Sequence, residues 1–356
     1  MLKNLNIKNT ILKLFFKLKA NITKVSQNLR FKLYLKYTDY AKIQINPFNQ
    51  TYNPITPTGN LSLLVNYVIW QNDINIKKKI FLNNSEKKNV NNLFSNGYQI
   101  VQSDDFKKFN NQYNFSKILN LFENKLNAKT DTEEILKQNI FFIDSPTIFF
   151  EDLIKLYEIE EINKIVKNYL GADACLHNGE LMKLSKNTNS SQGSALYHHD
   201  TIGHRLKIYF NFNSVEKLID RPTHYAKSSH INFWPEHNAK TSRFDEKYVN
   251  DEFIVDKLYS KSDEIVIFDT NGLHKGYYNN NNNERYSLVL EYGTIKKFKD
   301  FKRLGNFPYG IKKQKISKKI NLSKTLINQD YLVDKGDYYN YGEHWWKETQ
   351  PLFYYG

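Results

Sequence analysis

A histidine-rich segment, Leu196-Tyr197-His198-His199-Asp200, stands just before the strand pattern Leu206-Lys207-Ile208-Tyr209-Phe210-Asn211-Phe212. In an extended backbone, residues i and i+2 point to the same face, so His198 and Asp200 are expected to converge while His199 turns away. One imidazole nitrogen and one carboxylate oxygen are two parts of the facial triad that holds ferrous iron and leaves coordination positions open. The segment therefore predicts two metal ligands beside a β-strand.

A third ligand is expected from a later strand. The apolar run Glu264-Ile265-Val266-Ile267-Phe268 leads into a turn that presents His274, and eight of the nine histidines lie between His177 and His274. Eleven residues beyond His274, Arg285 opens the strand pattern 285–292. The planar guanidinium of Arg285 is suited to binding a carboxylate through two parallel hydrogen bonds.

The remaining pattern indicates a β-rich fold with helices around it. Segment 93–101 predicts a helix end, a C-cap at Gly97 and the start of a strand. Residues 103–170 are mostly helical in pattern. After Gly171, short apolar runs bounded by polar clusters predict strands at 181–184, 206–212, 231–234, 264–268 and 286–292. This order is typical of an α+β protein, mainly β with flanking helices, built on an antiparallel sandwich or roll.

Charge and cysteine content exclude several classes of protein. Residues 1–38 carry nine Lys or Arg and no acid, so the other 318 residues hold only +5 of the formal net charge of +14. This mild balance argues against nucleic-acid binding over the main domain. The lone Cys175 excludes an internal disulfide framework. The sequence lacks both an apolar run of membrane-spanning length and a convincing signal peptide, which favours a cytoplasmic location.

The motifs resemble, in the same order, the phytanoyl-CoA dioxygenase-like iron(II)/2-oxoglutarate oxygenases. The resemblance covers about residues 90–295. It rests on Gly97-Tyr98, the aromatic-His-x-Asp motif at Tyr197–Asp200, the distal His274, Arg285, and the segment Arg221–His230, which has Ser228 in place of the family's glycine.

The resemblance implies a double-stranded β-helix, or jelly-roll and cupin-like, core. It implies that His198, Asp200 and His274 bind Fe(II), and that Arg285 binds the distal carboxylate of 2-oxoglutarate, with O2 as the second co-substrate. Lys207 is a further candidate for binding 2-oxoglutarate. Because related halogenases lack a carboxylate at the position of Asp200, hydroxylation of a small-molecule substrate is implied. The candidates for lining the substrate pocket are Tyr197, Tyr225 and Trp234.

Four segments are expected along the chain: a basic amphipathic segment at 1–40, a linker and helical arm at 41–90, the oxygenase domain at 91–300, and a basic, aromatic extension at 301–356. The first segment is interpreted either as a helix on an anionic membrane surface or as a helix packed on the main domain.

Two other functions stay open at this point. A zinc-dependent hydrolase would use the histidine cluster, with His198, His199 and His204 as ligands. A non-catalytic β-roll module would dock through its basic N-terminal segment on membranes or acidic partners.

Overall fold

The computed structural model describes residues 84–128, 132–135, 140–186, 193–200, 204–232, 244–277, 283–295, 317 and 319–327. All of them belong to one compact unit, Ile69–Gly342. The predictions made for segment 1–40, for most of the arm at 41–90, for Trp234 and for most of the extension at 301–356 lie outside the described residues. Among the described helices, none is both long and apolar enough to cross a membrane.

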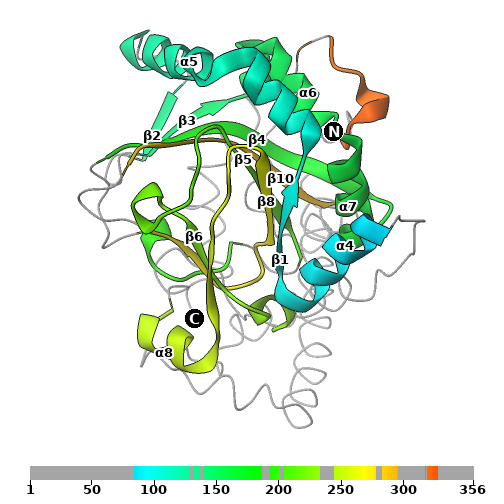
Figure 1. Cartoon of the computed structure of the whole chain (residues 1–356), viewed down its shortest axis with the longest axis vertical. Helices are drawn as coiled ribbons and strands as arrows, with labels where there is room; N and C mark the ends of the chain where they lie inside the picture. Colours follow the sequence, from blue (N-terminus) through cyan, green and yellow to red (C-terminus); the bar gives the residue numbers. More distant parts are fainter. Residues whose placement is uncertain are drawn as a thin grey trace, which may run out of the picture. The chain divides into compact units, whose positions relative to one another are not determined.

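The described domain is an α+β structure with two antiparallel sheets, the architecture of a double-stranded β-helix (Figure 1). The larger sheet contains, in spatial order, β1 (Tyr98–Gln102), β8 (Glu264–Asp269), β5 (Leu206–Asn211), β10 (Arg285–Thr294), β4 (Ala174–Leu184), β3 (Ile140–Asp144) and β2 (Thr132–Ile135). The smaller sheet contains β7 (Val255–Leu258), β6 (Thr223–Ala226) and β9 (His274–Gly276).

Helices cover the outer face of the larger sheet. They are α4 (Asn84–Asn96), α5 (Asp104–Ala128), α6 (Ile154–Tyr157) and α7 (Glu160–Leu170), and Figure 1 shows them on the side away from β6. The alternate residues Leu206, Ile208 and Phe210 of β5 face these helices and share one hydrophobic core with Phe106 and Ile165. A further helix, α8 (Glu246–Glu252), packs on the smaller sheet through Val249. Short 3-10 helices occupy Pro146–Ile148, Glu151–Leu153, Gly193–Ala195, Leu218–Asp220, Ser229–Ile231 and Leu322–Lys324.

The inner face of the larger sheet is more polar. In β5 the residues between the core positions are Lys207, Tyr209 and Asn211, and their cross-strand partners in β10 are Glu291, Val289 and Ser287. Tyr225 of the smaller sheet packs against Phe268 across the interior, and Tyr209 packs against the same cluster. The space between the two sheets therefore combines aromatic rings with buried charged groups.

The helix-to-strand turn at Gly97 is confirmed. Helix α4 ends at Asn96, Gly97 has a φ of 84°, and β1 begins at Tyr98. A Cβ at Gly97 would lie 2.4 Å from the Tyr225 hydroxyl and 2.6 Å from Nδ1 of His230. Ser228 also has a left-handed φ, of 62°, a conformation that glycine adopts more readily than serine.

The prediction of strands is confirmed at 206–212, 264–268 and 286–292, give or take two residues, whereas 181–184 is the end of the longer β4. The strand predicted at 231–234 does not begin at Ile231, which ends a 3-10 helix and is 55% exposed, and residues 233–234 lie outside the described residues. Strands β2 and β3 interrupt the segment predicted as helical, and β6, β7 and β9 were not predicted. These are short strands, of three to five residues, and their pairing partners hold them in place more than their own alternation does.

Candidate metal centre

Backbone hydrogen bonds bring the two halves of the predicted triad together. The amide of His198 donates to the carbonyl of His274 at 2.9 Å, and the amide of His274 donates back to His198 at 2.8 Å. The amide of Asp200 donates to the carbonyl of Thr270, in the turn after β8, at 3.0 Å. The loop before β5 is thus fixed to the turn that leads into β9.

The three side chains predicted as ligands converge. One ligand atom from each of His198, Asp200 and His274 lies within 4.8 Å of the other two. Oδ1 of Asp200 is 3.4 Å from Nε2 of His198 and 3.6 Å from Nε2 of His274. Both histidines are buried, with exposed fractions of 6% and 4%. Two imidazoles and one carboxylate in this arrangement fit a facial iron site.

The second nitrogen of each imidazole is held by the backbone. Nδ1 of His198 donates to the carbonyl of Leu196 at 2.7 Å, and Nδ1 of His274 donates to the carbonyl of Gly272 at 2.9 Å. Because a carbonyl oxygen only accepts, each Nδ1 carries the hydrogen and each Nε2 keeps its lone pair. Such hydrogen bonds fix the tautomer and the ring orientation of metal-binding histidines. The donor set therefore suits a divalent metal ion.

The electrostatics of the site favour the protonation states that a metal needs. Burial, reinforced by the neighbouring His198, lowers the pKa of His274 to about 3, so its imidazole is neutral. Burial on its own would raise the pKa of Asp200, but the positive charge of the Lys207 ammonium holds that pKa well below its usual range. A neutral imidazole and an ionised carboxylate are the ligand forms of these residues.

Lys207 points into the interior rather than toward solvent, with a side chain 15% exposed. Its Nζ lies 2.6 Å from Oδ2 of Asp200 and 3.1 Å from Oε1 of Glu291. Arg205 also contacts both carboxylates, at 3.6 Å from Asp200 and 2.7 Å from Glu291. Arg205 and Glu291 were not predicted as site residues from the sequence. The sequence signal for Glu291 is a glutamate within the apolar run Leu288-Val289-Leu290-Glu291-Tyr292. In the structure this glutamate lies across the sheet from Lys207.

Arg285 is buried at the start of β10, with an exposed fraction of 3%. Its Nε donates to Oδ1 of Asn211 at 3.1 Å and one terminal nitrogen donates to the carbonyl of Arg221 at 2.8 Å. The guanidinium carbon lies 4.7 Å from the centre of the Tyr209 ring. Tyr209 contacts Phe268 at 5.4 Å between ring centres, and Phe268 contacts His274 at 5.1 Å. A row of rings thus connects Arg285 with the triad.

The three aromatic residues predicted for the substrate pocket have different positions. Tyr225 is fully buried in the interior, and its ring stacks on that of His274 at 6.5 Å between centres. Tyr197 packs instead in a separate cluster with Ala226, Val249 and Leu273, beneath α8. Strand alternation explains this, since Tyr197 directly precedes His198 and faces the opposite way. Trp234 lies outside the described residues.

The alternative zinc set does not form. His199 turns away from His198, and its ring lies 6.4 Å from that of Phe244. Nδ1 of His204 contacts the carboxylate of Asp269. Among the described residues, His198, Asp200 and His274 are the group whose geometry could hold a metal ion. The hydrolase interpretation that used His198, His199 and His204 is therefore wrong.

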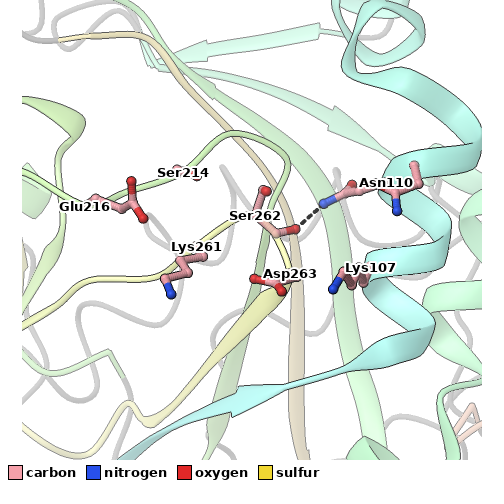
Figure 2. A pocket seen from close by; sticks show the side chains of 8 residues that line it. Lys107, Asn110, Ser214, Glu216, Lys261, Ser262 and Asp263 are labelled. Atoms are coloured by element: carbon pink, nitrogen blue, oxygen red, sulfur yellow. Dashed lines mark hydrogen bonds between the residues drawn. The ribbon is translucent and has the colours of Figure 1, made fainter.

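A surface pocket of about 260 Å³, shown in Figure 2, is lined by residues that directly precede β8, whereas Asp200 contacts the turn after β8. The side chain of Asn110, on α5, donates to the carbonyl of Ser262 across it. Its lining is polar: Lys107, Asn110, Asn111, Ser214, Glu216, Lys261, Ser262 and Asp263. The pocket contributes no side chain to the candidate metal centre.

No protein-family model and no curated protein matches the sequence. Among solved structures, the chain is similar to the epimerase SnoN in complex with Fe3+, alpha ketoglutarate and nogalamycin RO (12% identity, 59% of this chain and 84% of SnoN, TM-score 0.45). It is also similar to HygX from Streptomyces hygroscopicus with nickel, 2-oxoglutarate and hygromycin B bound (11%, 59% and 87%, TM-score 0.43). A third is EctD from S. alaskensis with bound Fe (13%, 62% and 82%, TM-score 0.48). This likeness concerns the fold, and the candidate site is defined by the side chains of this chain.

Proposed function

We propose that the chain is a non-haem Fe(II)/2-oxoglutarate-dependent dioxygenase that hydroxylates a small molecule. One observation carries the proposal: two buried imidazoles, each anchored through Nδ1, direct Nε2 toward one oxygen of an ionised carboxylate. Two histidines and one carboxylate form the facial triad of non-haem iron oxygenases, which leaves positions open for co-substrates. His198, Asp200 and His274 are the residues that would hold the iron.

Bound iron would supply the redox chemistry that couples oxidative decarboxylation of 2-oxoglutarate to succinate with hydroxylation of the substrate by O2. The protein's contribution is to bind and orient the reactants. The carboxylate of Asp200 fills a ligand position that related halogenases leave without one, which supports hydroxylation as the outcome.

Arg285 would bind the distal carboxylate of 2-oxoglutarate. Asn211 and the carbonyl of Arg221 hold its guanidinium in one orientation inside the roll. A charged hydrogen bond to a carboxylate is strong in such a buried place. The rings of Tyr209 and Phe268, between Arg285 and His274, give the co-substrate an apolar wall.

Tyr225 would help to keep water away from the metal and from the substrate. Its ring lies nearly parallel to that of His274 at 6.5 Å between centres, and its hydroxyl donates to the carbonyl of Asp269 at 2.8 Å, which fixes the ring. We propose Tyr225 and Trp234 as residues of the substrate pocket.

The proposal is tested by adding Fe(II) and 2-oxoglutarate without oxygen and recording the visible charge-transfer band of the complex. On admission of oxygen, succinate should form. Arg285→Leu should raise the Kd for 2-oxoglutarate by about tenfold or more while leaving iron binding unchanged, and Arg285→Lys should recover part of the loss. Thermal melting shows whether each variant is folded. Failure to bind iron, together with no succinate from any substrate pool, would overturn the proposal.

A further inference from the structure

The two oxygens of Asp200 face different partners. Oδ1 faces the two imidazoles, at 3.4 Å from Nε2 of His198 and 3.6 Å from Nε2 of His274. Oδ2 instead accepts a hydrogen bond from Nζ of Lys207 at 2.6 Å and lies 3.6 Å from a terminal nitrogen of Arg205. We propose that Lys207 is a positioning residue that makes Asp200 bind the metal through Oδ1 alone, and so keeps one more coordination position open. This inference rests on the proposed function.

The position of Lys207 is set by the sheet and not by Asp200. Lys207 on β5 lies directly across from Glu291 on β10, and their side chains form an ion pair at 3.1 Å. Glu291 is itself fixed by Arg205, whose guanidinium donates to Oε2 at 2.7 Å. The ammonium group therefore has a fixed place on a regular strand. Asp200 belongs to the loop before that strand, so its carboxylate is oriented by the ammonium.

A carboxylate can bind a metal ion through one oxygen or through both. For Asp200 to use both, the metal would have to share Oδ2 with the Lys207 ammonium or displace it. Displacement breaks a short charged hydrogen bond and leaves a buried ammonium with only Glu291 as its close partner. The positive charge also repels a metal cation on the Oδ2 side of the carboxylate. Both effects favour binding through Oδ1 alone.

An open position matters for the co-substrate. A 2-oxo acid can chelate a metal through its carboxylate and its keto oxygen, which requires two neighbouring positions. A second oxygen from Asp200 would occupy a position that water or 2-oxoglutarate otherwise takes. Lys207 would thus lower the intrinsic metal affinity of the site and raise the affinity of the loaded site for its co-substrate.

The test uses Mn(II), whose electron paramagnetic resonance signal broadens in oxygen-17 water in proportion to the number of bound waters. In Lys207→Met we expect one bound water fewer than in the wild type. The Kd for Mn(II) should stay the same or fall, because a cation is removed and an oxygen ligand is gained. The Kd of the loaded protein for 2-oxoglutarate should rise by about tenfold or more. Lys207→Arg keeps the positive charge and should keep the water number of the wild type.

Lys183→Met is the matched control. Lys183 is also a strand lysine with a side chain 15% exposed and a carboxylate partner, Glu284 at 3.4 Å, but it lies on β4, away from the triad. This control should retain the wild-type water number and both affinities. Weaker Mn(II) binding in Lys207→Met, with an unchanged water number, would show that Lys207 only supports the fold and would overturn the inference.

A measurement on the wild type covers the case in which Lys207→Met does not fold. The splitting between the two carboxylate stretching bands is larger for a carboxylate bound through one oxygen than for one bound through two. Infrared spectra of Mn(II)-loaded protein with isotopically labelled aspartate should show the larger splitting, and the smaller one would contradict the inference. If the wild type binds no Mn(II) at all, the proposed function fails. If it binds Mn(II) through both oxygens, only the inference about Lys207 fails.

Discussion

Two buried clusters in this domain contain the same residue types, two histidines and one aspartate. One is the candidate metal centre, His198, Asp200 and His274. The other is centred on Asp269, with His204 in contact with its carboxylate and the ring of His230 6.1 Å from that of His204. The comparison shows that residue type does not distinguish a ligand set from a structural network. The two kinds of cluster are distinguished by whether hydrogen-bond donors of the protein already occupy both carboxylate oxygens.

Asp269 is surrounded by hydrogen-bond donors. Oδ2 accepts from the hydroxyl of Tyr169 at 2.6 Å and contacts Nδ1 of His204. Oδ1 accepts from the backbone amide of Asn271 at 2.8 Å and from that of Arg205 at 3.4 Å. Both oxygens are thus used for holding the protein together. At Asp200, by contrast, Oδ1 faces two nitrogen lone pairs, an arrangement that a metal cation stabilises.

The second cluster supports the first. Asp269 fixes the turn after β8. The amide of the next residue, Thr270, donates to the carbonyl of Arg205 at 2.8 Å, and the carbonyl of Thr270 accepts a hydrogen bond from the amide of Asp200 at 3.0 Å. The turn then continues to Gly272, whose carbonyl holds Nδ1 of His274. The cluster around Asp269 is therefore part of the scaffold that positions Asp200 and His274, two of the proposed metal ligands.

The largest expected effect is a loss of metal affinity when a residue of the first cluster, but not of the second, is replaced. His274→Ala should weaken Mn(II) or Ni(II) binding by more than about 100-fold, since loss of a ligand exceeds the usual effect of residues around a metal site. His204→Ala should weaken binding by less than about tenfold. Isothermal titration calorimetry measures both. Equal losses in the two variants would mean that the two clusters do not differ in the way proposed.

The next effect concerns the stability of the metal-free protein. Asp269→Asn should lower the free energy of unfolding by about 2 to 3 kcal/mol, because an amide nitrogen cannot accept from Tyr169 or His204. Asp200→Asn should cost less, since Lys207 and Arg205 keep Glu291 as a partner. Urea unfolding of both variants gives the two values. If Asp200→Asn lost more unfolding free energy than Asp269→Asn, the carboxylate of Asp200 would be mainly structural as well.

Local patterns were sufficient to predict much of this site. Period-two alternation alone predicts that His198 and Asp200 share a face, and the structure brings them together. Applied one residue earlier, the same rule also turns Tyr197 away from the ligands, in agreement with its place in a separate cluster. The core strands β5, β8 and β10 were predicted because each carries an apolar run long enough to be recognised.

What the sequence could not supply depends on pairing between distant segments. His274 lies on β9, a strand of three residues that exists because it pairs with β6 and with His198. Lys207 has the pattern of a solvent-facing strand lysine until Glu291 is known to lie across from it. Contacts of this kind are set by sheet register, which a local pattern does not contain.

The last expected effect is a pH dependence that belongs to the cluster around Asp269. Burial lowers the pKa of His230 to about 4, from an ordinary value near 6.5. A histidine with a lowered pKa stabilises the fold fully above its unfolded-state pKa, and this contribution is lost as the pH falls from about 6.5 toward 4. One such group changes the unfolding free energy by at most about 1.4 kcal/mol per pH unit.

His230→Gln should therefore make the unfolding free energy, measured with urea, depend less on pH between pH 6.5 and 4, because glutamine does not titrate. Nε2 of His230 donates to the carbonyl of Phe94 at 3.1 Å, and a glutamine amide can donate in the same way. The flattening should be the same size with and without Mn(II), since His230 is not among the proposed ligands. A dependence of the flattening on Mn(II) would mean that the two clusters share the metal, and the distinction drawn between them would fail.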